Sequence, residues 1–114
     1  LFATTALAQP YPNKPIRVAV AFPPGGPVDI IARLLGPKLS DALGQPVVVE
    51  NKVGASGNIA TTEVARSAPD GYTLLTHSSA YAVNPTLYSN AGYDPAKDLV
   101  PVAIVAGPLT TRSR

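Results

Sequence analysis

The sequence feature that most constrains the fold is an alternation of short apolar runs with stretches of helical periodicity. The runs 16–22 (IRVAVAF), 46–50 (PVVVE) and 72–76 (YTLLT) have the length and composition of strands. Between them, apolar residues recur every three or four positions over 28–43, and 59–67 carries a shorter helical pattern. Strands separated by helices pair in parallel, with helices on both faces of the sheet. The sequence therefore predicts an α/β fold with a parallel sheet flanked by helices.

Proline and glycine positions refine this prediction. Gly44 is expected to end the first helix, and Pro37 is expected to bend that helix or remove one of its hydrogen bonds. Residues 77–84 fit either a loop or the start of a helix. Residues 99–106 (LVPVAIVA) predict a fourth strand, after which residues 110–114 abandon the apolar pattern.

Composition excludes several function classes. With 114 residues, of which 46% are hydrophobic and 14% charged, the chain is long enough and apolar enough to fold. The nine Lys and Arg residues are spread evenly and aromatic residues are few, so nucleic-acid binding is not expected. The absence of cysteine excludes disulfides and thiolate chemistry. Metal-ligand clusters and nucleotide-binding motifs are also lacking, so neither a metal nor a cofactor is expected.

The first residues suggest export. Residues 1–8 (LFATTALA) are small and apolar, and Ala6 and Ala8 fit the A-x-A pattern of signal-peptide cleavage. We interpret residues 1–8 as a signal-peptide remnant, with an ordinary apolar terminus as the alternative. No other segment approaches the roughly 20 apolar residues of a membrane span.

Three loops follow the predicted strands at their carboxyl ends, the edge where open parallel sheets bind ligands. They comprise residues 23–29, 51–58 and 77–84. The first contains three prolines and two glycines in five positions. The prolines restrict the conformation of this loop, and the glycines leave its backbone uncovered by side chains. Gly25 and Gly26 are expected to let a ligand approach their N–H groups, and the start of the next helix favours an anion such as a carboxylate.

Several polar residues in these loops have both a structural and a binding interpretation. Asp29 lies in the first helical turn, where capping or dipole stabilisation is favoured over ligand contact because Asp is common at helix starts. Its charge would repel an anion unless its oxygens face away. Residues 54–58 resemble a small anion nest, with a plain capped turn as an equal alternative. Thr76, Ser78 and Ser79 offer hydroxyl groups that could orient a polar ligand.

A catalytic interpretation is disfavoured. His77 is the only histidine, and its neighbour Ser78 would point away from it on a strand. The sequence has no G-x-S-x-G motif, and residue types alone do not make a catalytic triad. An α/β hydrolase-like enzyme remains the alternative from a different class.

Five ordered motifs between residues 11 and 106 carry a family resemblance. They are YPxKPIR at 11–17, FPPGGPxD at 22–29, GQPVVVEN at 44–51, PDGYTL at 69–74 and NPxLY at 84–88. With them the chain resembles the Bug/TctC family, the extracytoplasmic solute receptors of tripartite tricarboxylate transporters. The resemblance implies a type II periplasmic binding protein fold, in which two α/β lobes close over a small carboxylated ligand. It identifies residues 9–114 as part of the N-terminal lobe, with the second lobe absent.

The resemblance also implies how the ligand is held. Backbone groups, hydroxyls and ordered waters of the first lobe would bind a ligand carboxylate. The matching positions are Phe22, Pro24, Gly25, Gly26, Pro27, Asp29, Gly54, Ser56, Gly57, Asn58, Thr76, Ser78 and Ser79.

The implied protein is a monomeric periplasmic receptor rather than an enzyme. Its ligand would be a di- or tricarboxylate, or a carboxylated aromatic or amino acid. It would deliver this ligand to membrane transporter subunits. A ligand sensor that signals to a membrane kinase is the alternative among binding proteins.

Overall fold

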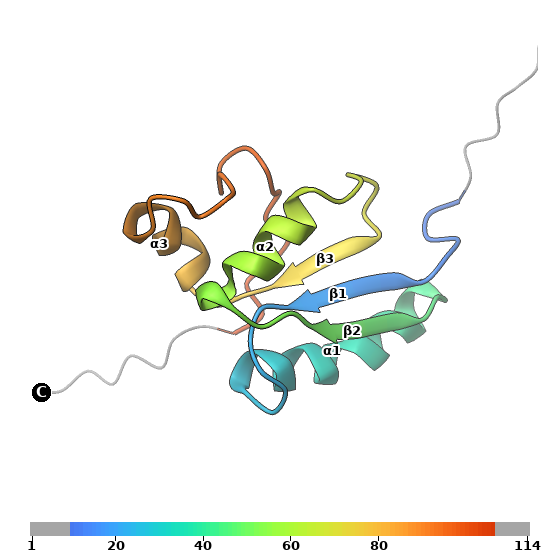
Figure 1. Ribbon diagram of the computed structural model, residues 1–114. Coiled ribbons are helices and arrows are strands. Elements are labelled where there is room, and N and C mark those ends of the chain that lie inside the picture. The colour runs from blue at the N-terminus through green and yellow to red at the C-terminus, as the bar shows by residue number, and fades with distance from the viewer. Residues whose placement is uncertain (1–9, 107–114) are drawn as a thin grey trace, which may run out of the picture.

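The computed structural model describes residues 10–106, which form a three-stranded parallel sheet with helices on both faces (Figure 1). Its elements in chain order are β1 (Ile16–Val20), α1 (Pro27–Leu43), β2 (Val47–Asn51), the short 3-10 turn η1 (Ala55–Gly57), α2 (Asn58–Ala65), β3 (Thr73–Thr76) and α3 (Ala80–Leu87). The strand order is β2-β1-β3, and both neighbouring pairs are parallel. The predicted α/β architecture is confirmed. The expectations for residues 1–8 and 110–114 lie outside the described residues.

The core forms where β1 meets α1. Val18 and Val20 are buried against Ala32 of α1. Arg17, which precedes Val18, instead bonds Glu63 of α2. Because successive side chains of a strand point to opposite faces, α1 and α2 cover opposite faces of the sheet (Figure 1).

Helix α1 begins and ends where proline and glycine predict. Pro27 is its first residue, a position where proline loses no intrahelical hydrogen bond. Gly44 follows the last turn with φ of 72°, and its N–H donates to the Ser40 carbonyl at 2.9 Å. Pro37 lies inside the helix, which nevertheless continues to Leu43.

The structure decides between the loop and the helix start that were both predicted for residues 77–84. Residues 77–84 divide into a short loop and the first turns of α3, which begins at Ala80. Helix α2 begins at Asn58, one residue before the predicted start, and ends at Ala65. Among the described residues, no helix is both long and apolar enough to cross a membrane.

The predicted fourth strand at residues 99–106 is wrong for this structure. These residues form no strand, and Val100, Val102 and Ile104 are 88%, 84% and 92% exposed. A strand needs a neighbour whose N–H and C=O groups pair with its own. Within residues 10–106 the sheet consists of β1, β2 and β3, and none of them pairs with this segment. An apolar run shows strand propensity, but it does not supply the partner.

Candidate functional site

Three loops meet at the carboxyl edge of the sheet because the three strands are parallel. We call residues 23–29 loop 1, residues 51–58 loop 2 and residues 77–79 loop 3. They follow β1, β2 and β3 respectively, and the arrowheads in Figure 1 point to this shared edge. All thirteen residues predicted to bind ligand lie in these loops or beside them, at the ends of the strands and the start of α2.

Loop 1 is held from within by a buried carboxylate. Asp29 is 3% exposed, and its Oδ2 accepts a hydrogen bond from the Gly25 N–H at 2.9 Å. Its Oδ1 accepts from Asn51 Nδ2 at 2.9 Å, and Arg33 Nε lies 3.0 Å from both oxygens. The Gly25 amide, helped by Asn51 and Arg33, lowers the pKa of Asp29. These contacts support the structural interpretation of Asp29, which ties loop 1 to α1 and β2.

Two residues of this cluster were not predicted from the sequence. Arg33 lies four residues after Asp29, a spacing that places both side chains on one helix face and could have indicated the ion pair. Asn51 also donates to the Phe22 carbonyl at 3.0 Å, so one amide joins both sides of loop 1 to β2. No local pattern marks this contact, because residues 22 and 51 meet only in the folded sheet.

The expectation that Gly25 and Gly26 present their N–H groups to a ligand is wrong in this structure. The Gly25 amide donates to Asp29, and the Gly26 amide donates to the Pro23 carbonyl at 3.2 Å. Gly25 is required for another reason, since its φ of +85° is a conformation that other residues rarely adopt. Within residues 10–106, no hydrogen-bond partner is found for the amides of Val28 and Asp29. The donors of loop 1 therefore lie at the first turn of α1.

Loop 2 takes an unusual backbone path that α3 holds in place. Ala55 and Ser56 have φ of 48° and 56°, although neither is glycine. Asn84 of α3 is 2% exposed, and its Nδ2 donates to the Ser56 carbonyl at 2.8 Å and to Asn58 Oδ1 at 2.9 Å. Asn58 thus faces inward, and Asn84 is a further residue that sequence reasoning missed. The Ser56 hydroxyl remains at the surface, 3.0 Å from the hydroxyl of Tyr88.

Loop 3 contributes hydroxyl groups at the start of α3. Ser78 and Ser79 are exposed, and Ser78 Oγ accepts weakly from the Ala80 N–H at 3.3 Å. Thr76 is half-buried, and its carbonyl accepts from the Ala21 N–H at 3.3 Å, which joins the ends of β1 and β3. The two serine hydroxyls are therefore the ligand-accessible groups of loop 3.

His77 lies where the three loops converge. Its ring is in edge contact with Phe22, at 5.2 Å between centroids, and Nδ1 lies 3.0 Å from the Ser78 carbonyl oxygen. Burial lowers the pKa of His77. Nδ1 thus bonds backbone rather than a serine hydroxyl, so His77 and Ser78 do not form a nucleophile and base.

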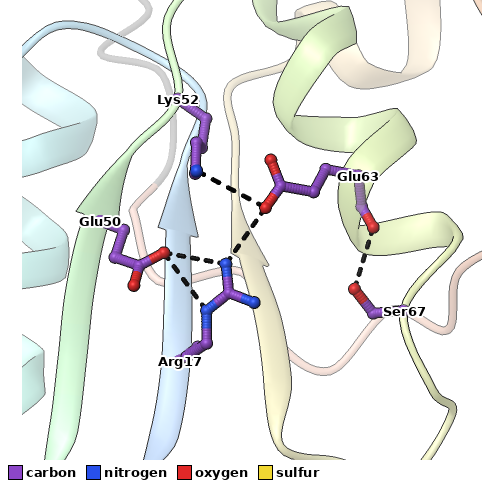
Figure 2. A network of polar contacts seen from close by, with 5 residues as sticks. All are labelled: Arg17, Glu50, Lys52, Glu63 and Ser67. Carbon is purple, nitrogen blue, oxygen red and sulfur yellow. Dashed lines mark hydrogen bonds and ion pairs between the residues drawn. The ribbon is translucent and has the colours of Figure 1, made fainter.

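The cations nearest to the loops are already paired with carboxylates. Arg17 lies 2.8 Å from Glu50 and 3.1 Å from Glu63, and Lys52 lies 3.6 Å from Glu63. Figure 2 shows how these side chains face one another. Arg33 is paired with Asp29. An anion at the loop edge would therefore meet neutral donors, namely amides and hydroxyls.

Neither the surface hollows nor the possible metal ligands of the described residues indicate a binding site away from the three loops. One shallow hollow lies at the opposite end of the sheet beside Tyr11 and Tyr72, and another lies between α1 and β2. Both are open to solvent and neither includes loop 2 or loop 3. In the described part of the chain, no cluster of His, Cys, Asp or Glu is suited to a metal ion.

Solved structures define the class of protein to which this architecture corresponds. The fold matches "Structure of periplasmic binding protein BugD" with a TM-score of 0.75 and 46% identity, over 77% of this chain and 29% of that chain. It matches Rpa4515 of R. palustris, solved with adipate, with a TM-score of 0.73 and 39% identity, over 76% of this chain and 29% of that one. It also matches MatC from Rhodopseudomonas palustris with bound malate, with a TM-score of 0.72 and 42% identity. This match covers 83% of this chain and 33% of that chain. The fold is that of periplasmic binding proteins.

Sequence comparison identifies the family. Residues 31–111 match the tripartite tricarboxylate transporter family receptor, TctC, and the chain belongs to this family. Protein BugT of Bordetella pertussis is 49% identical over 110 residues, which cover 90% of this chain and 34% of BugT. A UPF0065 protein from the tcbD-tcbE intergenic region of Pseudomonas sp. is 42% identical over 84% of this chain and 29% of its own length. The chain thus spans about a third of the length of these relatives. The family and its structural neighbours are solute receptors rather than enzymes, in agreement with the sequence interpretation.

Proposed function

We propose that this chain supplies part of a periplasmic receptor that captures a small organic acid for a membrane transporter. The observation that carries the proposal is the concentration of neutral donors at one edge of the sheet. These are the first-turn amides of α1 and the hydroxyls of Ser56, Ser78 and Ser79. The adipate and malate bound to two structural neighbours are both dicarboxylates, which supports an acid of this class.

The geometry favours a carboxylate over a neutral solute. The start of α1 carries a partial positive charge and unpaired N–H groups, both of which stabilise an anion. Because nearby lysines and arginines are paired, the ligand charge would be balanced by oriented dipoles and not by an ion pair. Asp29 does not oppose this arrangement, since its two oxygens are turned toward Gly25, Asn51 and Arg33.

The rest of the ligand would be held elsewhere. One carboxylate fits the loop edge, whereas the remainder of a dicarboxylate would project away from this lobe. Family membership supports a second lobe that closes over it, and closure excludes water from the bound ligand. The same membership supports delivery to the membrane subunits of a tripartite transporter, from a periplasmic location.

Calorimetry on the full-length protein tests this function. Malate and adipate are titrated beside the diamides of the same acids, which match them in shape but carry no charge. We expect at least one dicarboxylate to bind and its diamide not to bind. Ser79→Ala should weaken that binding about three- to tenfold, the effect of one lost hydrogen bond. Binding of diamide and acid with equal affinity would contradict a carboxylate site.

A further inference from the structure

His77 occupies a position that joins the binding loops to one another. Its ring contacts Phe22 beside loop 1, and it lies 6.0 Å between centroids from Tyr81 of α3. On its other side lies Gly57 of loop 2, where an added Cβ would overlap His77 Nε2 and come within 3.1 Å of the Ala21 Cβ. One ring therefore fills the space between the end of β1, loop 2 and α3.

The hydrogen bonding of this ring distinguishes its two nitrogens. Nδ1 lies 3.0 Å from the Ser78 carbonyl oxygen, an acceptor, so Nδ1 carries the proton and donates it. Nε2 is buried and has no hydrogen-bond partner among the described residues. The uncharged ring leaves Nε2 without a proton. A charged ring would place a second N–H in the narrow space against Gly57, where the Gly57 backbone favours the charged form but burial disfavours it more.

We propose that the neutral imidazole of His77 is a positioning residue of the ligand site, holding loop 1 and loop 2 at the spacing that ligand binding requires. This inference rests on the proposed function for its ligand, but the contacts that define it belong to the unliganded loops. His77 does not itself bind the ligand, because its donor nitrogen is used by Ser78 and its other nitrogen is buried against Gly57.

Acid should release this contact. The groups around His77 are Phe22, Gly57 and Ala21, which do not ionise, and Tyr81, whose own pKa is raised by burial. Asp29, the carboxylate of loop 1, is directed to other partners. The backbone groups of Ser78 and Gly57 favour the charged ring, but burial outweighs them and none of these neighbours carries a negative charge, so protonation of Nε2 should loosen the contact. Protonation occurs below the ordinary pKa of 6.5, because burial lowers the pKa of His77.

Hydrogen exchange of the unliganded full-length protein tests the inference without any ligand. His77→Ala should speed exchange about tenfold at the Gly25, Gly26 and Gly57 amides, since the ring that holds the loops is gone. His77→Phe keeps a ring of similar size and should leave these amides protected. Tyr72→Phe is the matched control, because it keeps the ring and removes the hydrogen bonds to Asn13 at the opposite end of the sheet, away from loop 1 and loop 2.

The pH profile separates positioning from general stability. The protection of the loop amides, taken relative to their intrinsic exchange rate at each pH, should fall in the native protein as the pH falls through the lowered pKa of His77, and in His77→Phe it should stay flat over that interval. Malate and adipate titrations on the same variants should show affinity weakened about tenfold by His77→Ala and unchanged by Tyr72→Phe. Equal exchange in native protein and His77→Ala would overturn the inference, whether or not a dicarboxylate binds. Tighter dicarboxylate binding at acid pH in the native protein, absent in His77→Phe, would overturn it as well, since it would make His77 a cationic ligand contact. Failure of both acids to bind, with the exchange result as expected, would count only against the proposed ligand.

Discussion

Two glycines at the loop edge share a backbone conformation but differ in their surroundings. Gly25 has φ of +85° and Gly57 has φ of +91°. A Cβ on Gly25 would meet nothing within 4 Å, whereas one on Gly57 would overlap the His77 ring. Sequence alone treats them as equivalent loop glycines, and only the fold shows that Gly57 is constrained by contact as well as by conformation.

This difference gives a matched pair of substitutions. Gly25→Ala should cost about 1–2 kcal/mol, the strain of a left-handed residue. Gly57→Ala adds a steric overlap and should cost about 2–5 kcal/mol. Urea unfolding of the full-length variants measures both free energies. Equal losses for the two variants would show that the His77 ring moves aside without cost.

Asp29 should make the protein sensitive to strong acid. Its pKa is lowered in the folded state, so its contribution to stability is present above the ordinary value of 3.8 and is lost as pH falls through the lowered value. Asp29→Asn should therefore reduce the unfolding midpoint at neutral pH, and the gap to the native protein should narrow in acid. Urea midpoints of both proteins across that pH range test this prediction. A gap that does not change with pH would mean that charge is not what Asp29 contributes.

At the scale of elements, the charged network of Figure 2 joins α2 to the sheet. Arg17 of β1 bridges Glu50 of β2 and Glu63 of α2. The three side chains are 37–42% exposed, so water and salt screen their attraction. The network fixes where α2 lies more than it stabilises the fold.

Replacing Arg17 tests whether this network contributes little to the stability of the fold. Arg17→Met should cost at most about 1 kcal/mol at low ionic strength, and less in high salt. Urea unfolding at two salt concentrations measures the difference. A loss well above this value that salt does not reduce would indicate that Arg17 contributes packing through its aliphatic stem instead.

At the scale of the whole molecule, residues 99–106 are an apolar segment without a strand partner. Val102, Ile104 and their neighbours are exposed, and no backbone hydrogen bond joins this segment to the rest of the described chain. In the 114-residue chain their amides should exchange with solvent quickly, whereas amides of the central strand β1 should exchange slowly. Exchange measured by NMR checks this contrast. Slow exchange at 102–105 would show that the segment pairs with a β-strand after all, most simply in a second molecule.

Much of the architecture could be predicted from sequence because its determinants are local. The period of apolar residues locates α1, and the short apolar runs locate β1, β2 and β3 within one or two residues. Gly44 ends α1 as predicted. The three loops follow from this alternation, because parallel strands bring their carboxyl ends to one edge.

The chemistry of that edge has a local part and a tertiary part. The amides of Gly25 and Gly26 are engaged by Asp29 and Pro23, which lie four and three residues away, so this contact is local although it was not predicted. Asn51 and Asn84 reach loops 29 and 28 residues away in sequence, at distances that no local pattern encodes. Local sequence sets backbone conformation and apolar period, whereas the partner of each polar group depends on which segments the completed sheet brings together.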